Sequence, residues 1–94
     1  MPLILGIELH EDFFVGDERF ELVEINLPTR MKVKRVRDGK VFPISDTEAQ
    51  EIAPEVFLSS GKPLAAKRAR CALDAPTEIR IMRGHNYREA HAHG

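Results

Sequence analysis

Six basic side chains gather in one short stretch of the chain, and their spacing suits contact with phosphate groups. They are Arg30, Lys32, Lys34, Arg35, Arg37 and Lys40. Asp38-Gly39 lies among them and is a strong signal for a tight hairpin turn, so residues 31–36 and 41–44 should form a two-stranded ribbon, with Pro43 at its edge. A basic ribbon can follow a nucleic-acid backbone or enter a groove. The alternative is a solvated hairpin whose charges discourage aggregation of strand edges.

The whole chain carries no charge bias that would match this local patch. Its 94 residues have a formal net charge of −1 and a pI of about 6.4, so any nucleic-acid site must be local. A chain of this length buries a modest fraction of its surface, and dimerisation would help a fold made of short strands. We therefore expect a single small domain that acts with a partner.

Other reactive residue types form no recognisable catalytic or metal site. Cys71 lies in an alternating apolar run, which predicts a buried strand thiol in a reducing compartment, and pairing it with His10 as a nucleophile has no local support. His85, His91 and His93 have no recognised ligand spacing and read as a solvated tail. We therefore expect no cofactor, no metal and no enzymatic activity.

Alternating apolar residues predict strands at both ends of the chain. Residues 3–9 alternate with a period of two, which is typical of a strand with one buried face. A short apolar run at 13–15 ends in the turn pair Gly16-Asp17 and returns over 19–25 as a hairpin. Residues 68–73 alternate again before Asp74-Ala75-Pro76 closes the strand, and Ile79 and Ile81 begin a last strand that ends at Arg83. Gly84 should keep the following helix short or frayed.

The middle of the chain also contains a helix signal. Ser45-Asp46-Thr47-Glu48 has the spacing of a capping box, which predicts a short helix over residues 46–52. Residues 59–63 read as a flexible exit loop.

Two blocks of sequence stand apart from this middle segment. Residues 3–18 open with Leu-Ile-Leu and end with Val-Gly-Asp-Glu, and residues 74–83 read Asp-Ala-Pro-Thr-Glu-Ile-Arg-Ile-Met-Arg, followed by Tyr87. In this order they resemble the carbon storage regulator family, the RNA-binding translational repressors of bacteria. The resemblance divides the single domain 1–94 into a core of residues 1–26 and 67–94 and an insertion of residues 27–66, which the short members lack.

This resemblance implies a small antiparallel β domain of about five strands that forms a strand-exchanged homodimer. The expected fold is mainly β, with the inserted ribbon and short helix and a short C-terminal helix. Each of two symmetric sites would lie between the first strand of one subunit and the last strand of the other and would grip a GGA element of RNA. Arg83 matches the family's arginine at the end of the last strand, and Leu5 matches its first-strand leucine. An arginine can pair bidentately with phosphate or with guanine.

The residues expected to contact RNA come from two regions. In the strand site they are Leu5, Arg80 and Arg83, and in the ribbon they are Lys32, Lys34, Arg35 and Arg37. A core position for Leu5 and a salt bridge from Arg83 to Glu78 or Glu89 are the structural alternatives. Arg68 and Arg70 would extend the positive surface if they face outward. Phe13 and Phe14 suit stacking on bases, but core packing is favoured.

Two functions compete at this point. Ile7 and Glu8 stand where the family usually has two arginines, and this change would remove phosphate contacts and add repulsion. In the first, the chain is a cytoplasmic homodimer that binds GGA-containing leader RNA or small RNA and blocks translation. A protein antagonist is a possible further partner. The alternative is a degenerate member that acts as a dimeric protein-interaction module with weak or no RNA binding. Arg83 and the ribbon favour the first. No segment approaches the length of a membrane span.

Overall fold

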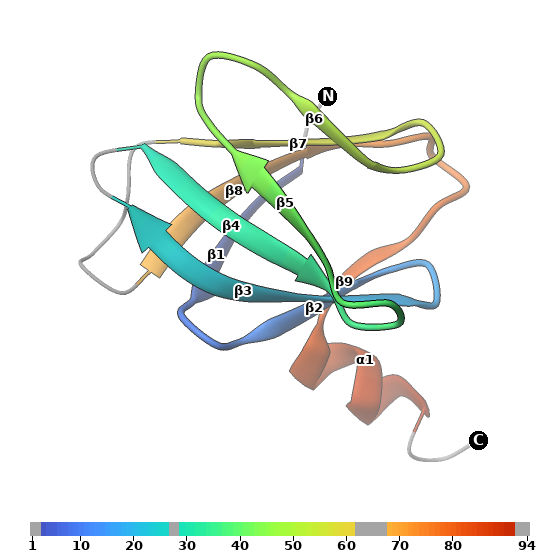
Figure 1. Ribbon diagram of the computed structural model, residues 1–94. Coiled ribbons are helices and arrows are strands. Elements are labelled where there is room, and N and C mark those ends of the chain that lie inside the picture. Colours follow the sequence, from blue (N-terminus) through green and yellow to red (C-terminus); the bar gives the residue numbers. More distant parts are fainter. Residues whose placement is uncertain (1–2, 27–28, 62–67, 92–94) are drawn as a thin grey trace.

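The protein is a pair of antiparallel β-sheets with one helix at its C-terminal end (Figure 1). The structure is a computed structural model that describes residues 3–26, 29–61 and 68–91. The first sheet has the order β1-β8-β7-β6, with strands β1 (Leu3–Glu8), β8 (Arg68–Asp74), β7 (Val56–Ser60) and β6 (Gln50–Ala53). The second has the order β5-β4-β3-β2-β9, with strands β5 (Lys40–Ile44), β4 (Arg30–Arg35), β3 (Glu18–Asn26), β2 (Asp12–Val15) and β9 (Ile81–Arg83). The prediction of a mainly β, antiparallel fold is confirmed.

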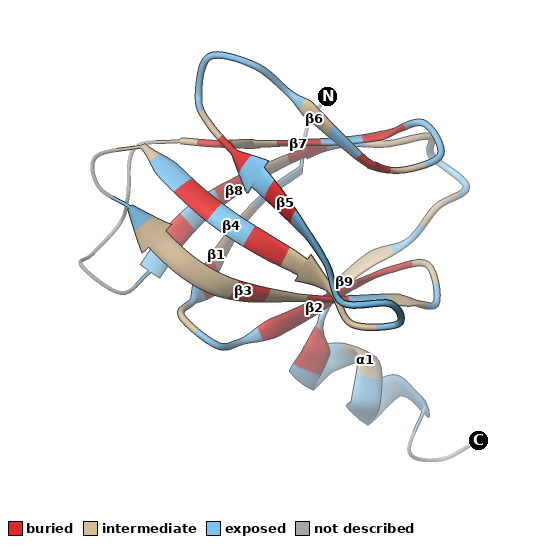
Figure 2. Ribbon diagram, viewed as in Figure 1, coloured by how far each residue is buried: buried red, intermediate tan, exposed pale blue. Residues whose placement is uncertain are grey.

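One apolar core lies between the two sheets (Figure 2). It follows from the two-residue period of the strands: Ala69, Cys71 and Leu73 of β8 face inward and are buried, as predicted, while Arg68 and Arg70 face outward. The predicted core packing is confirmed for Phe13, which is 0% exposed. Phe14 is 9% exposed, but it lies outside this core and is covered by the ring of Tyr87. Neither ring is therefore free to stack on a base.

The predicted hairpins are confirmed by their turns. β2 and β3 are joined at Gly16-Asp17, and Gly16 has a φ of 60°. β4 and β5 are joined through Asp38-Gly39, where Gly39 has a φ of 76°. Glycine adopts this left-handed conformation without the steric cost that a side chain would add. The inserted ribbon therefore exists, and Pro43 lies in its edge strand β5.

The prediction of a helix over residues 46–52 is wrong. Residues 46–48 form bends, and β6 begins at Gln50 and pairs with β7. The Ser45 hydroxyl lies 3.3 Å from the hydroxyl of Thr47 and does not cap a helix. Ile52 is 1% exposed in the core, so burial in a sheet outweighs a local helix signal. The strand count also exceeds the expected number, because the described residues form nine strands.

The inserted residues are built into both sheets. β4 and β5 extend the sheet of β2, β3 and β9, while β6 and β7 extend the sheet of β1 and β8. Their core residues are Met31, Val33, Phe42, Ile44, Ile52, Val56 and Leu58. Ser59 and Ser60, expected in a loop, lie in β7, and the rest of that expected loop beyond Gly61 falls outside the described residues.

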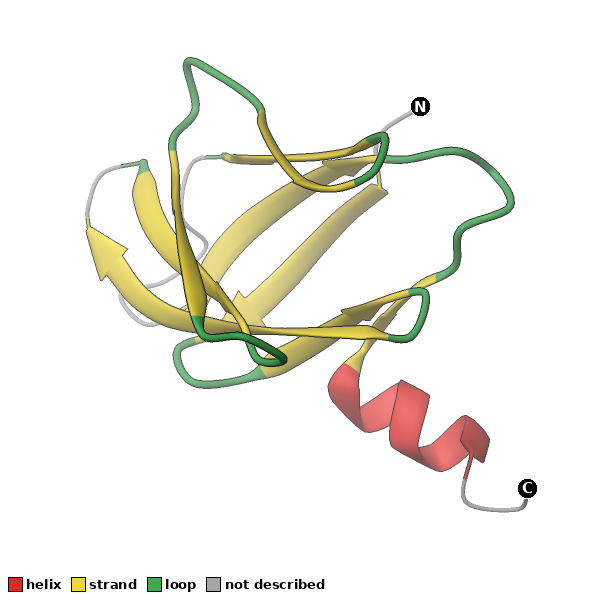
Figure 3. Cartoon of the chain, turned by 45° about the vertical axis from the view of Figure 1, so that its right-hand side comes forward, coloured by secondary structure: helices red, strands yellow, loops and turns green. Residues whose placement is uncertain are grey.

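The C-terminal end is a short strand followed by a helix. β9 is three residues long and shorter than predicted, since Ile79 precedes it, and α1 (Gly84–His91) begins at Gly84 itself. The helix projects from one end of the sheets (Figure 3) and packs against β2 and β9. The Tyr87 ring stacks on Phe14 with 3.7 Å between ring centroids, and its hydroxyl donates to Asp17 at 3.0 Å. This hydrogen bond is the main reason that the pKa of Tyr87 is raised.

Candidate nucleic-acid interface

An open groove runs between the first and last strands of the chain. β1 is an edge strand of one sheet and β9 is an edge strand of the other. The groove is lined by Leu3, Leu5, Arg80, Ile81, Met82, Arg83 and Asn86, and we call it the β1–β9 groove. It brings together the three residues predicted for the strand site, although Leu5 and Arg83 are far apart in the sequence. The groove lies within one chain, whereas the resemblance implies a site between the first strand of one subunit and the last strand of the other.

Strand pairing positions these side chains. β9 pairs with β2 so that Arg83 lies opposite Phe13, and Leu5 of β1 lies opposite Cys71 of β8. Leu5 is half-buried and packs against the core as well as lining the groove. Leu5 therefore packs against the core, as the structural alternative predicted, and also lines the groove.

Arg83 is exposed at the end of β9, beside the apolar part of the groove. The predicted alternative, a salt bridge to Glu78 or Glu89, is wrong among the described residues, because Arg83 has no carboxylate within 4.0 Å there and Glu89 pairs with His85 at 3.3 Å. Its planar group therefore presents donors that can serve phosphate or guanine.

The two residues that differ from the carbon storage regulator pattern, Ile7 and Glu8, have structural roles. Ile7 is 1% exposed and packs in the core opposite Ala69. Glu8 lies opposite Arg68, and its carboxylate meets the Arg68 guanidinium at 2.8 Å. An opposite charge at this distance offsets the acidic charge that Glu8 adds beside the groove.

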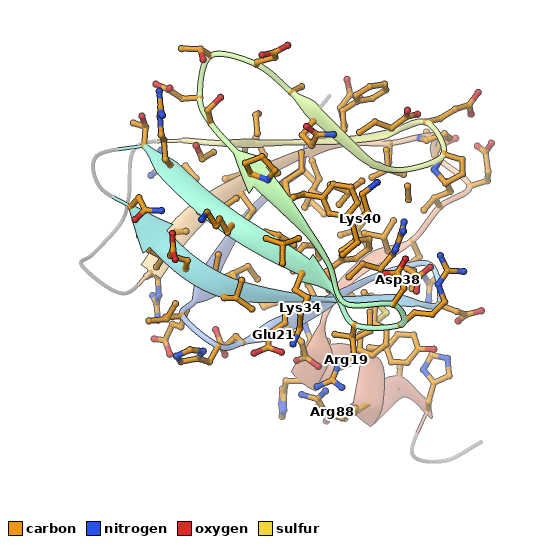
Figure 4. The ribbon with its side chains drawn as sticks, in the orientation of Figure 1. Arg19, Glu21, Lys34, Asp38, Lys40 and Arg88 are labelled. Carbon is orange, nitrogen blue, oxygen red and sulfur yellow. The ribbon has the colours of Figure 1, made fainter. Side chains whose placement is uncertain are left out.

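Carboxylates of the neighbouring strand β3 form ion pairs with cations of the basic ribbon. Lys32 meets Glu24 at 3.5 Å and Lys34 meets Glu21 at 3.8 Å, both across the β3–β4 register. Figure 4 shows Glu21 and Lys34 side by side on neighbouring strands. Arg37 meets Glu18 at 3.4 Å. We call these three pairs the β3–β4 ladder. Each cation of the ladder has an acidic partner, so the local charge is far more balanced than the sequence of the ribbon suggests.

The turn of the ribbon holds a further pair. Arg35 donates to both oxygens of Asp38, at 3.0 and 2.6 Å, and the backbone N–H of Lys40 donates to the same carboxylate. These contacts, the Arg35 bond first, hold the pKa of Asp38 well below its usual range. The Arg35 guanidinium and the Lys40 ammonium also lie 5.5 and 5.1 Å from the centre of the Phe42 ring, which is within cation–π range. Structural contacts therefore occupy most of the ribbon cations.

A second group of charges, which the sequence reasoning missed, surrounds Asp12. Its carboxylate is 9% exposed and accepts from Arg19 Nε at 2.7 Å and from Arg88 Nη1 and Nη2 at 2.7 and 3.2 Å. Arg19 and Arg88 approach each other beside α1 in Figure 4. The Arg88 bond is the largest of the effects that lower the pKa of Asp12, and Arg19 adds to it against the opposing effect of burial. The only sequence signal is an acidic residue beside a buried apolar run.

Gly84 lets the helix approach this carboxylate. A Cβ placed on Gly84 would lie 1.8 Å from Asp12 Oδ1 and 2.4 Å from Cγ. Asp12 is short and held by two guanidiniums, so it has little freedom to move aside. Glycine is therefore required here for close packing. The cavity around this cluster has a volume of about 350 Å³ and is also lined by Glu11, Arg83 and His85. We call it the Asp12 pocket.

The remaining candidate residues take no part in a site. Cys71 is fully buried, as predicted, and burial raises the pKa of its thiol to about 12. Among the described residues, no three His, Cys, Asp or Glu side chains are grouped to hold a metal ion, and His93 lies outside them. The described part of the chain also contains no helix long and apolar enough to cross a bilayer.

Comparisons of the chain with protein-family models, with curated proteins and with solved structures found no match.

Proposed function

We propose that this chain is an RNA-binding regulator that acts as a homodimer, holds GGA-containing leader RNA in the β1–β9 groove and blocks translation of that RNA. The observation that carries the proposal is the meeting of Leu5, Arg80 and Arg83 in one groove. For Leu5 and Arg83 the resemblance to the carbon storage regulators implies RNA contact, and Arg80 adds a second guanidinium beside them. An apolar wall beside exposed guanidiniums suits a base with its phosphate.

Two features of the strand edges support the dimer. β1 and β9 each pair on one side only among the described strands, so each presents backbone donors and acceptors on the other side. Leu3 and Ile4 of β1 are 42% and 52% exposed, and covering them would remove apolar surface from water. Pairing of these edges with a second copy would satisfy both needs, and the resemblance implies that the second copy is joined by strand exchange. Sedimentation as a folded monomer of 10.7 kDa would contradict it.

Charge pairing in the ribbon favours the alternative function, a dimeric protein-interaction module. The ladder carboxylates reduce the positive charge available to phosphates, and Ile7 supplies packing where the family supplies an arginine. Under this alternative the same dimer would form, but a protein partner would take the place of RNA.

The deciding experiment is a titration of a labelled RNA hairpin with GGA in its loop, beside a hairpin with the GGA scrambled, at a salt concentration near physiological. We expect preference for GGA, and we expect Arg83→Ala to cost about 1–3 kcal/mol of that binding. Arg70→Ala is the matched control for general loss of positive charge, because Arg70 is exposed on the outer face of β8 and does not line the groove; it should weaken binding of both hairpins equally and only slightly.

The other outcomes separate the competing functions. Equal and strongly salt-dependent binding of both hairpins, indifferent to Arg83, would move the contact to the ribbon. Absence of binding to either hairpin by the dimer would favour the protein-interaction module.

A further inference from the structure

The Asp12 pocket holds more positive than negative charge. Arg19, Arg83 and Arg88 line it, against the carboxylates of Asp12 and Glu11. The Asp12 carboxylate is saturated by Arg19 and Arg88, and Glu11 is turned toward the backbone, where it accepts from the N–H of Glu8 at 2.8 Å. These five side chains therefore give the pocket a surplus of one positive charge.

The guanidiniums keep donors that Asp12 does not use. Arg19 binds Asp12 through Nε alone, and among the described residues its two terminal nitrogens have no partner. Arg88 gives one edge to Asp12 and is 58% exposed. Arg83 makes no ion pair in the described part of the chain. Three guanidiniums thus present unused N–H groups at one cavity, and guanidiniums match the oxygens of a phosphate bidentately.

Asp12 also prepares these donors for a ligand. A free arginine side chain has about 2 kcal/mol of rotamer entropy to lose when it is ordered. Here the buried carboxylate already orders Arg19 and Arg88, so an incoming anion meets donors that are held in place. The cavity volume of about 350 Å³ lies in the lower part of the range of small-ligand sites.

We propose that the Asp12 pocket binds a phosphate group. The pocket adjoins the β1–β9 groove through Arg83, which lines both. The phosphate can belong to a nucleic-acid strand or to a small phosphorylated molecule, since both offer the same oxygens to the guanidiniums. The proposal stands on the pocket alone and does not depend on recognition of GGA.

The test is an NMR titration of the full-length chain with inorganic phosphate at constant ionic strength, with chloride as the reference anion. We expect saturable shifts of the Gly84 and His85 amide signals. Arg83→Gln should weaken phosphate binding about tenfold, and Arg70→Gln, which alters an arginine outside the pocket, should leave it unchanged. Shifts that do not saturate, or equal affinity in Arg83→Gln, would overturn the proposal.

A variant with the opposite expected effect guards against general loss of structure. Glu11→Gln removes a carboxylate from the pocket and keeps the side-chain oxygen that accepts from Glu8. Phosphate should bind this variant about twofold to fourfold more tightly, because a charge repulsion of a few tenths of a kcal/mol or more is removed. Unchanged or weaker binding in Glu11→Gln would contradict the site.

The source of the phosphate is tested with a short RNA that lacks GGA, with and without a 5′-phosphate. Shifts of Gly84 and His85 that require the 5′-phosphate would assign the pocket to terminal phosphates and small phosphorylated molecules. Shifts with both forms would assign it to the backbone of a strand. If inorganic phosphate fails to bind while the GGA hairpin binds, this proposal fails and the proposed function remains.

Discussion

The β3–β4 ladder and the Asp12 pocket are both rich in cations, but they treat those cations in opposite ways. In the ladder each of Lys32, Lys34 and Arg37 has its own partly exposed acidic partner at 3.4–3.8 Å. In the Asp12 pocket one nearly buried carboxylate is shared by two guanidiniums, and Arg83 stands beside them without a partner among the described residues.

The comparison shows that the number of cations in a region does not determine how well that region can bind an anion. Exposed ion pairs contribute about 0–1 kcal/mol each and leave little net field. Two guanidiniums on one buried carboxylate leave a positive remainder in a confined space, where charges are screened less by solvent. The richer sequence pattern is thus the weaker candidate for phosphate binding.

The largest expected effect comes from matched glycine substitutions in the two regions. Gly84→Ala would drive a methyl group into Asp12, and we expect it to lower the free energy of unfolding by about 3 kcal/mol, although alanine favours helices. Gly39→Ala in the ribbon turn meets no atom within 4 Å and should cost about 1 kcal/mol, because only its left-handed backbone is strained. Urea denaturation measures both, and equal losses would show that Asp12 yields easily.

A smaller effect should follow from Asp12→Asn, and it should depend on pH. The native pKa of Asp12 is lowered, so its charge stabilises the folded state above the ordinary aspartate pKa of about 3.9, and this contribution is lost as the pH falls through the native pKa. We expect the variant to be about 1 kcal/mol less stable at pH 7, since both guanidiniums are half-exposed. The difference should shrink below pH 4. A constant difference down to pH 2.5 would mean that packing, not charge, is responsible.

Substitutions in the ladder should change RNA affinity less, and only when they remove one partner of an ion pair and leave the other. Lys32→Gln together with Glu24→Gln removes one whole pair and should leave affinity for the GGA hairpin within about twofold of the parent. Lys32→Gln alone exposes the Glu24 charge and should weaken binding slightly, with a changed salt slope. A loss in the double variant as large as that of Arg83→Ala would place the ladder in the RNA site.

The smallest effect is a titration shift without a marked change in stability. Since Arg35 and the Lys40 N–H hold the pKa of Asp38 down, its carboxyl signal in a ¹³C NMR titration should still report the charged form at pH 3. In Arg35→Gln the same signal should titrate closer to the ordinary value of about 3.9. Identical titrations in the two proteins would show that the Arg35 contact is not maintained in solution.

Local signals predicted much of this fold, and long-range contacts explain what they missed. The turns at Gly16-Asp17 and Asp38-Gly39 are confirmed because each lies between strands that it directly joins. The capping box at Ser45 failed because β6 pairs with β7 and buries Ile52, at the irregularity between Glu51 and Ala53, in the core; a local pattern does not contain this long-range contact.

For the candidate sites too, the prediction succeeded where the sequence contained a direct signal and failed where contacts between distant residues decide. Leu5 and Arg83 were predicted together from a resemblance in two separate blocks, and they do line one groove with Arg80. The cluster of Asp12 and Arg88 was missed because these residues are 76 positions apart. The ladder partners of the ribbon were missed because Glu18, Glu21 and Glu24 come from the preceding strand, whose register was unknown.

The pairing of β1 with β8 has a consequence for the order in which the chain acquires its structure. Glu8 and its partner Arg68 are 60 positions apart, so during synthesis, at about 5–20 residues per second, the first strand waits several seconds for its neighbour. Throughout this interval the apolar residues of the first segment have no strand with which to pair; they are Leu3, Ile4, Leu5 and Ile7. Nucleation should therefore begin in the β2–β3–β4–β5 meander, whose contacts are local, with β1 joining last. A chain that ends before Arg68 would lack the partner of β1 and should be prone to aggregate through its first strand.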